Sequence, residues 1–216
     1  MSRNWPSHRQ CARAGWVCAL LLLGLSIPGG SAAETTPAPG MLLVAVRGMS
    51  DPNFAGTVVL LVQHNSGGSL GLVLNRPVPH RLDEALPGLE LDADVTPFLF
   101  QGGPVGLNGL MFLFRSDEDS DDALRVMEET HLGSDRGLLA ERLEAAPGYA
   151  HLRVFIGHAG WAPGQLEHEL ARGDWLLVPA TDDTIWTPGT GDLWQRLIDP
   201  EGSGGQLVGR PHGAPS

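Results

Sequence analysis

The polar side chains best suited to chemistry gather in one stretch, Gly157 to Leu170, which reads GHAGWAPGQLEHEL. In order, it contains His158, Trp161, Gln165, Glu167, His168 and Glu169. A histidine and a carboxylate that meet in a cleft can hold a metal ion or share the acid and base steps of a hydrolysis. The residue types therefore indicate either a binding site or hydrolase-like or metal-dependent chemistry that would use His158 and Glu167.

Helical spacing limits how many of these groups can meet. Consecutive helical residues point about 100° apart, so Glu167, His168 and Glu169 cannot all face His158. No His-Glu-x-x-His pair is present, and we expect no metal site. The same spacing puts Gln165 and Glu169 on one outer face and leaves Glu169 free to pair with Arg172. For Trp161 we favour packing at a buried edge, with a partner for its indole N–H, over stacking on a ligand.

Two further motifs have both a binding and a structural interpretation. Gly102 and Gly103 could form a nest of backbone N–H groups for an anion, but no phosphate-binding lysine follows, which favours a tight turn between strands. Asn75 and Arg76 end a predicted strand, where Arg76 would bind a carboxylate or pair with a nearby aspartate. The serines of the domain lack a Gly-x-Ser-x-Gly elbow. We therefore predict no catalytic residue and no cofactor.

The elements that must position these residues follow from hydrophobic patterning. Apolar, β-prone runs predict strands at 41–46, 57–64, 70–75, 97–100, 110–115, 124–130, 152–156 and 175–179. The turn Asn65-Ser66-Gly67-Gly68 joins the second and third of them as a hairpin. Helices are expected at 135–145, 164–172 and 191–198. The result is one compact α+β (mixed α/β) domain with a mixed, largely hairpin-built sheet and three short helices.

The ends of the chain differ in composition from this domain. Residues 1–33 have three arginines, an apolar run and the small residues Ser31-Ala32-Ala33, which predicts a signal peptide or an N-terminal anchor. Both cysteines, Cys11 and Cys18, lie in that segment, so the exported domain would have no disulfide. Residues 34–40 are predicted to be a linker, 41–198 the domain and 199–216 a disordered tail.

The net charge of the chain limits the classes of molecule that it can bind. Without residues 1–33 the chain keeps 11 arginines against 25 acidic residues, a net charge of −14. Such a surface repels phosphates, so direct binding to nucleic acid is not expected.

Five motifs in register resemble the YqgE/AlgH family. They are SDPNF (50–54), TVVLLVQHN…GLVLNRP (57–77), QGGPV (101–105), AGWAPGQLEHEL (159–170) and DWLLVPA (174–180). The resemblance implies a compact mixed α/β domain of bacterial origin without an established activity or cofactor. The motif positions that it carries over are Asp51, His64, Asn75, Arg76, Gly102, Gly103, Pro104, Gly160, Trp161, Gln165 and Glu167. Family members usually look cytosolic, and His158 stands where the family commonly has tyrosine.

Together these observations predict a non-enzymatic binding or regulatory domain, with a hydrolase-like or metal-dependent enzyme as the alternative. The expected binding residues are Asn75, Arg76, Gly102, Gly103, His158, Trp161, Gln165 and Glu167. The partner would be a protein or a small molecule, and the membrane would be involved only through an uncleaved N-terminal segment. We expect a periplasmic or secreted protein, with the cytoplasm as the alternative.

Overall fold

The computed structural model describes residues 36–85, 98–145, 151–186 and 190–200, all within one compact unit that spans 35–216. The predicted segment 1–33 and residues 201–216 of the predicted tail 199–216 lie outside these residues. The strands are β1 (Met41–Ala45), β2 (Val58–Asn65), β3 (Gly68–Val73), β4 (Pro77–Arg81), β5 (Phe98–Gln101), β6 (Val105–Arg115), β7 (Leu124–Arg125), β8 (Thr130–Gly133), β9 (Leu152–Trp161) and β10 (Trp175–Pro179). The helices are α1 (Leu82–Ala85), α2 (Arg136–Ala145), α3 (Gln165–Arg172), α4 (Asp182–Trp186) and α5 (Leu193–Ile198), and the 3₁₀ turn η1 (Thr190–Asp192) precedes α5.

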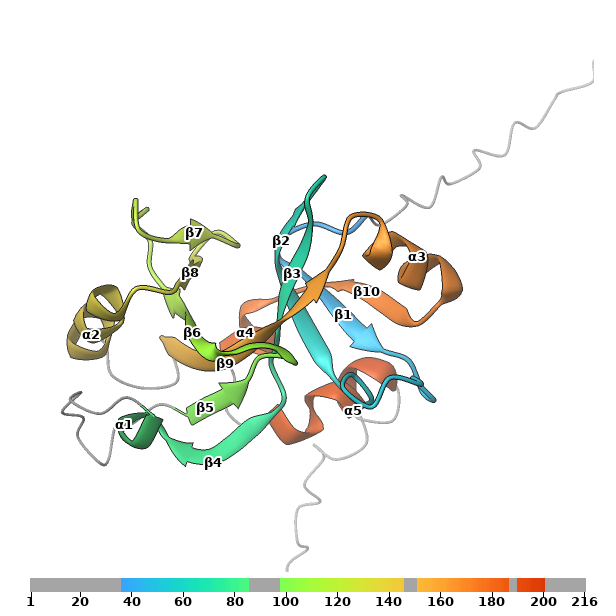
Figure 1. The fold of residues 1–216 in the computed structure, drawn as a ribbon, viewed down its shortest axis with the longest axis horizontal. Helices are drawn as coiled ribbons and strands as arrows, with labels where there is room; N and C mark the ends of the chain where they lie inside the picture. The colour runs from blue at the N-terminus through green and yellow to red at the C-terminus, as the bar shows by residue number, and fades with distance from the viewer. Residues whose placement is uncertain (1–35, 86–97, 146–150, 187–189, 201–216) are drawn as a thin grey trace, which may run out of the picture. The chain divides into compact units, whose positions relative to one another are not determined.

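One curled sheet runs through the domain in the order β10-β1-β2-β3-β9-β6-β8-β7. Its neighbours on this path are antiparallel, while β5 pairs parallel with β9 and antiparallel with β4. Figure 1 shows β9 crossing the centre of this arrangement. The α+β class is confirmed. The largely hairpin-built sheet is not, because β1, β3 and β9 find partners far away in the sequence.

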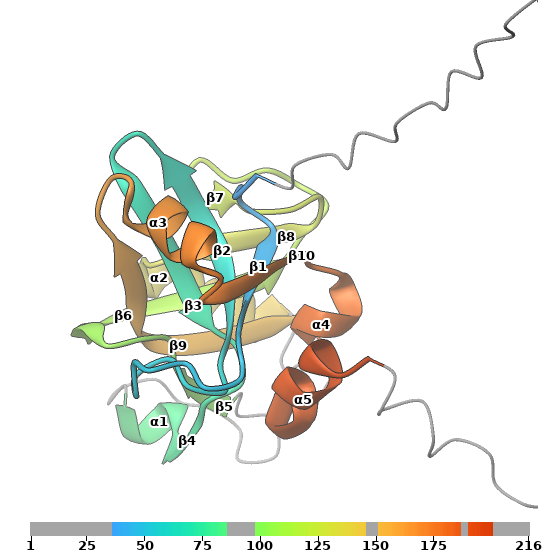
Figure 2. The same cartoon turned by 90° about the vertical axis from the view of Figure 1, so that its right-hand side faces the viewer.

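The strands β1, β2 and β3 are largely buried on both faces, because alternate residues enter different cores. Leu42 and Val44 of β1 pack with α4 and α5, whereas Leu43 and Ala45 pack with Leu166 of α3. A third cluster joins β5, β6 and β9 to α2. Figure 2 shows α4 and α5 beside β1, and α3 beside β3. This two-sided burial explains the near-continuous apolar runs in the sequence.

The three predicted helices are present as α2, α3 and α5, but α1 and α4 add to them, so the prediction of three was wrong. The helix α4 is short and polar in sequence, and it forms because Ile185 and Trp186 are buried against the core. Among the described residues, no helix combines the length and apolarity needed to cross a membrane.

The strand predicted at 152–156 is longer than expected and continues through Gly157 to Trp161. Gly157 has a φ of 68°, a conformation that glycine adopts without strain, and the chain passes through it and remains in the sheet. Beyond it, Ala159, Gly160 and Trp161 pair with β3. The strand predicted at 124–130 is instead two strands, β7 and β8, with a turn between them.

Candidate functional site

The end of β9 and the helix α3 form a corner in which Glu169 is the central polar group. One oxygen of its carboxylate, Oε2, accepts hydrogen bonds from the indole N–H of both Trp161 and Trp175, each at 2.8 Å. The other oxygen, Oε1, accepts one from the Gln165 side chain at 3.0 Å. Both tryptophans are buried, so the carboxylate satisfies two donors that would otherwise be left without partners. We call Phe54, Trp161, Gln165, Glu169 and Trp175 the α3 corner.

Aromatic packing completes the α3 corner. The ring of Phe54 stacks on Trp161 with centroids 5.9 Å apart and meets Trp175 edge-on at 5.4 Å. The two indole rings are edge-on to one another at 6.1 Å. These geometries are the ones that aromatic pairs prefer. The prediction that Trp161 packs at a buried edge and finds a partner for its N–H is therefore confirmed.

Helix α3 is placed by its own sequence. Gly164, in a left-handed conformation with φ of 77°, precedes it, and Gln165 turns back to accept a hydrogen bond from the Ala162 N–H at 3.1 Å. Leu166 is buried and Leu170 packs beside it. The expected pairing of Glu169 with Arg172 is wrong. Arg172 instead binds Asp174, because the indole donors already occupy Glu169.

Asn75 and Arg76 hold the loop that carries Phe54. The Asn75 side chain accepts from the Val58 N–H at 3.0 Å and donates to the Gly56 carbonyl at 2.9 Å. The Arg76 guanidinium donates to the Asn53 carbonyl at 2.5 Å, with longer contacts to the carbonyls of residues 52 and 55. In the described structure Arg76 thus binds backbone carbonyls, where a carboxylate was expected. Both side chains fix the loop and so position Phe54.

Gly102 and Gly103 allow two strands to approach closely. A Cβ on Gly102 would lie 2.4 Å from the Gly157 carbonyl oxygen, and one on Gly103 would lie 2.2 Å from the His158 carbonyl carbon. The Gly102 N–H donates to the Ile156 carbonyl, and its own carbonyl accepts from Val73. This N–H is therefore already used within the sheet, which supports the turn and close-packing interpretation over the anion nest.

The structure places His158 and Glu167 apart from one another. His158 is half-buried and lies against Gly106 of β6, on the face of β9 opposite to Ala159 and Trp161. Glu167 pairs instead with His64 of β2, with 3.5 Å between Oε1 and Nε2. The other nitrogen of His64, Nδ1, lies 2.8 Å from the Ser69 hydroxyl oxygen. The contact of Glu167 with His64 rather than His158 depends on strand order, which the sequence does not reveal.

Within the residues that the structure describes, no three histidine, cysteine, aspartate or glutamate side chains form a group that could hold a metal ion. Next to the α3 corner, Glu167 and His64 pair at the surface, with 49% of the Glu167 side chain and 20% of the His64 side chain accessible. Glu169 and Trp175 were missing from the expected site, although Trp175 sits in a motif of the family resemblance. Trp175 lies far from Trp161 in the sequence, so local patterns do not reveal that both indoles donate to the same carboxylate.

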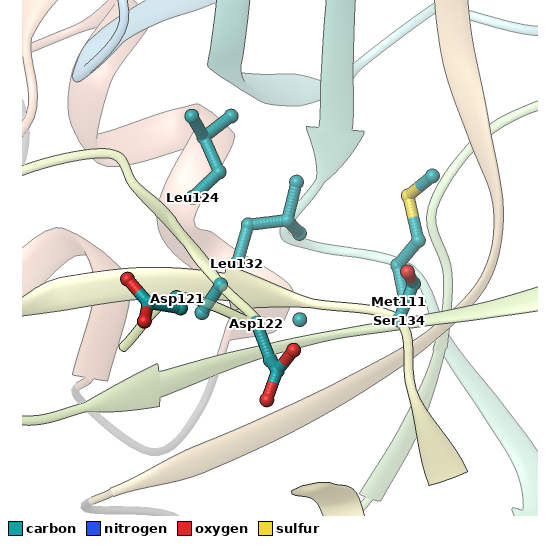
Figure 3. A pocket seen from close by; sticks show the side chains of 8 residues that line it. Met111, Asp121, Asp122, Leu124, Leu132 and Ser134 are labelled. Carbon is teal, nitrogen blue, oxygen red and sulfur yellow. The ribbon is translucent and has the colours of Figure 1, made fainter. Parts of the chain in front are cut away.

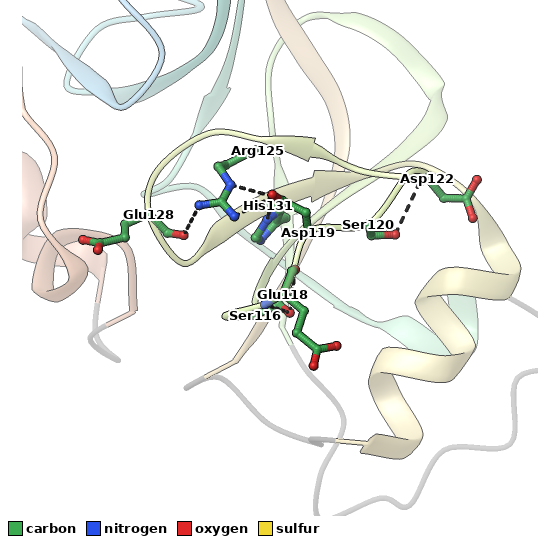
Figure 4. Close-up of polar contacts among 8 residues, drawn as sticks. All are labelled: Ser116, Glu118, Asp119, Ser120, Asp122, Arg125, Glu128 and His131. Carbon is green, nitrogen blue, oxygen red and sulfur yellow. Dashed lines mark hydrogen bonds and ion pairs between the residues drawn. The ribbon is translucent and has the colours of Figure 1, made fainter.

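A second polar cluster lies at the β7–β8 hairpin, and Figure 4 shows its contacts. The Arg125 guanidinium donates to Asp119 at 2.6 Å, and the buried His131 ring lies 3.5 Å from the same oxygen. Hydrogen bonds from Arg125 and then His131 hold the pKa of Asp119 below its usual 3.8, against a smaller opposing effect of desolvation. Interactions that depress the pKa of a carboxyl group contribute their full stability at pH values above the pKa of that group in the unfolded chain. That contribution is lost as pH falls below about 3.8 through the folded value.

Comparison with protein families gives one match over most of the chain. The family described as AlgH-like matches residues 42–204. A UPF0301 protein of Streptomyces avermitilis is 37% identical over 172 residues, which cover 76% of this chain and 87% of the relative. A UPF0301 protein of Chlorobium limicola is 32% identical over 171 residues, which cover 79% and 90%.

Two solved structures share the fold. The AlgH protein of Pseudomonas aeruginosa, solved in solution, is 28% identical with a TM-score of 0.63, covering 79% of this chain and 92% of its own. A crystal structure of a protein from Corynebacterium diphtheriae is 27% identical with a TM-score of 0.64, covering 77% and 88%. Neither description assigns a reaction or a ligand.

Proposed function

The chain belongs to the AlgH-like family, and we propose that it is a non-enzymatic binding or regulatory domain whose contact surface is the rim beside the α3 corner, formed by Glu167 and His64. The observation that carries the proposal is that the polar side chains at the α3 corner and beside it form two groups. Glu169, Gln165 and the two tryptophans satisfy one another, while Glu167 and His64 lie side by side and accessible. The first group forms a fixed frame, and the second is left to make contacts outside the molecule.

A fixed frame favours binding, because little conformational freedom is lost when a partner docks. Glu167 accepts hydrogen bonds, and the imidazole of His64 can donate or accept. We therefore expect a protein or small molecule that presents a cationic or hydrogen-bond-donating group. The net charge of −14 outside residues 1–33 favours the same class. Regulation would follow from such binding without direct contact with nucleic acid, which this charge disfavours.

The proposal predicts a specific photocrosslink at the rim. A benzoylphenylalanine replaces the exposed His168, next to Glu167, and cells of the source bacterium are irradiated. We expect one discrete adduct, with its yield reduced about tenfold by Glu167→Ala, since a charged hydrogen bond contributes roughly 1.5–3 kcal/mol. The matched control carries the same crosslinker at the exposed Glu144 of α2, where no adduct is expected.

Two results would contradict the proposal. The first is an equal pattern of adducts from positions 168 and 144. The second concerns the enzymatic alternative, which in this structure would have to use Ser69, His64 and Glu167 rather than His158. Covalent labelling of Ser69 by a fluorophosphonate, abolished by His64→Ala, would show an activated serine. The domain would then be an enzyme.

We also propose that the protein is exported, on the basis of the basic, apolar and small-residue pattern of residues 1–33. Expression of the full chain in a bacterium, followed by fractionation and intact mass, tests this. A periplasmic product that begins at Glu34 is expected. A cytoplasmic product that begins at Met1 or Met41 would return the protein to the compartment in which its family usually appears.

A further inference from the structure

A cavity of about 410 Å³ opens at the β7–β8 hairpin, away from the α3 corner. Its apolar lining comes from Met111 of β6, Ala123 and Leu124 around the start of β7, and Leu132 of β8. Leu124 is 44% exposed, one of the few large apolar side chains of the described surface that is so accessible. The volume lies within the range of protein ligand sites, near its lower end.

Two aspartates give this cavity its charge. Asp121 and Asp122 line it together with Ser134. Figure 3 shows the Asp121 carboxylate directed to the left and the Asp122 carboxylate directed downward, with Ser134 beside Met111 on the other side. Asp119, three residues before Asp122, is already paired with Arg125 and His131. Within the described part of the chain, Asp121 and Asp122 have no such cation. The cavity therefore joins an apolar surface to negative charge that the protein itself does not neutralise.

A side chain that complements such a cavity has an apolar stem and a cationic head. Arginine and lysine have this shape, and they bury their methylene groups while the charged end stays at a polar rim. Arginine adds a planar fork of donors that matches carboxylate oxygens. Flanking leucines on the same partner would cover Leu124 and Met111. The cavity is open to solvent, which suits one side chain of a docked segment.

We propose that this cavity is a second binding site, which takes an arginine flanked by apolar residues from a partner protein. The site is separate from the α3 corner and does not depend on the function proposed for it. Its features are the apolar floor of Met111, Leu124 and Leu132 and the two aspartates at its rim.

The test uses a defined probe, the fluorescein-labelled peptide acetyl-Gly-Ser-Leu-Arg-Leu-Ser-Gly-amide, with the purified protein in 150 mM salt. Fluorescence anisotropy should show saturable binding. Asp121→Asn/Asp122→Asn should raise the dissociation constant about tenfold, which corresponds to two modest ion pairs. Leu124→Asn should weaken binding about fivefold, because the apolar contact is lost. The matched control Asp183→Asn/Glu144→Gln removes the same two charges from exposed sites elsewhere and should leave the constant within twofold.

Non-specific attraction between a basic peptide and an acidic protein predicts a different result. If the control variant weakens binding as much as Asp121→Asn/Asp122→Asn, the aspartates have no special role and the proposal fails. It also fails if the leucines of the peptide can be replaced by serine without loss, or if the wild-type protein does not bind. Thermal unfolding of each variant checks that these exposed substitutions leave the fold intact.

Discussion

Replacement of Glu169 by alanine is expected to lower the free energy of unfolding by about 3 kcal/mol. The carboxylate accepts hydrogen bonds from two indole N–H groups, on Trp161 and Trp175, which are 5% and 3% exposed. Alanine leaves both donors without an acceptor inside the protein. A buried donor that loses its partner costs roughly 1–3 kcal/mol, and water entering beside the half-buried helix recovers part of that.

The matched control for this prediction is Glu167→Ala, two residues away on the same helix. Glu167 is half-exposed and makes a single 3.5 Å ion pair with His64, so we expect a loss below about 1 kcal/mol. Urea unfolding followed by tryptophan fluorescence measures both variants, and near-ultraviolet circular dichroism reports the packing of the indoles. Equal losses for the two variants would mean that Glu169 is not the structural centre of the corner.

Local signals in the sequence identified those elements whose residues are close together in the chain. The hairpin of β2 and β3 was predicted because Asn65-Ser66-Gly67-Gly68 supplies the turn and aliphatic runs flank it. The helix α3 was predicted from Gly164 and Gly173 at its ends and from the spacing of Leu166 and Leu170. In each case the physical cause lies within a dozen residues.

Features that depend on strand order could not be predicted in this way. The sequence does not show that β3 lies beside β9, and this neighbour relation extends β9 past Gly157 to Trp161. Likewise, α4 forms because Ile185 and Trp186 reach a core built by β1 and β2, and its own sequence shows no apolar stripe. Tertiary packing overrides local propensity at both places.

The residues of the candidate site show the same distinction between contacts that are local in the sequence and contacts that depend on strand order. The structural role of Trp161 was identified correctly, because its partner Glu169 lies only eight residues further along the chain, on α3. The outer face shared by Gln165 and Glu169 was also identified, because both residues belong to that helix. Asn75 and Arg76 were identified as important, but their role in holding the loop of Phe54 depends on a contact about 20 residues away in the chain. His64 was recognised only through the family motif. Its contact with Glu167 requires the folded hairpin to meet α3.

The close approach of β3, β5 and β9 leads to the other large expected effect, that of Gly102→Ala. A Cβ there would lie 2.4 Å from the backbone oxygen of Gly157 and 3.1 Å from side-chain atoms of Leu72 and Phe155. Since the nearest atom is backbone, a rotamer change cannot relieve the clash. The two strands must separate, which strains the hydrogen bond from the Gly102 N–H to the Ile156 carbonyl.

We therefore expect Gly102→Ala to lower the free energy of unfolding by about 4 kcal/mol, the sum of overpacking and weakened ladder hydrogen bonds. Gly191→Ala is the matched control, because a Cβ there meets no atom within 4 Å, and its effect should stay within about 0.5 kcal/mol. Urea unfolding measures both variants. If Gly102→Ala proves too unstable to purify, two other measurements report the loss of stability. They are its soluble yield compared with that of Gly191→Ala, and hydrogen exchange at the Val73 amide. A Gly102→Ala protein as stable as the control would show that β5 and β9 can separate without loss of folding free energy. The close packing of Gly102 would then have no part in positioning the end of β9 that carries His158 and Trp161.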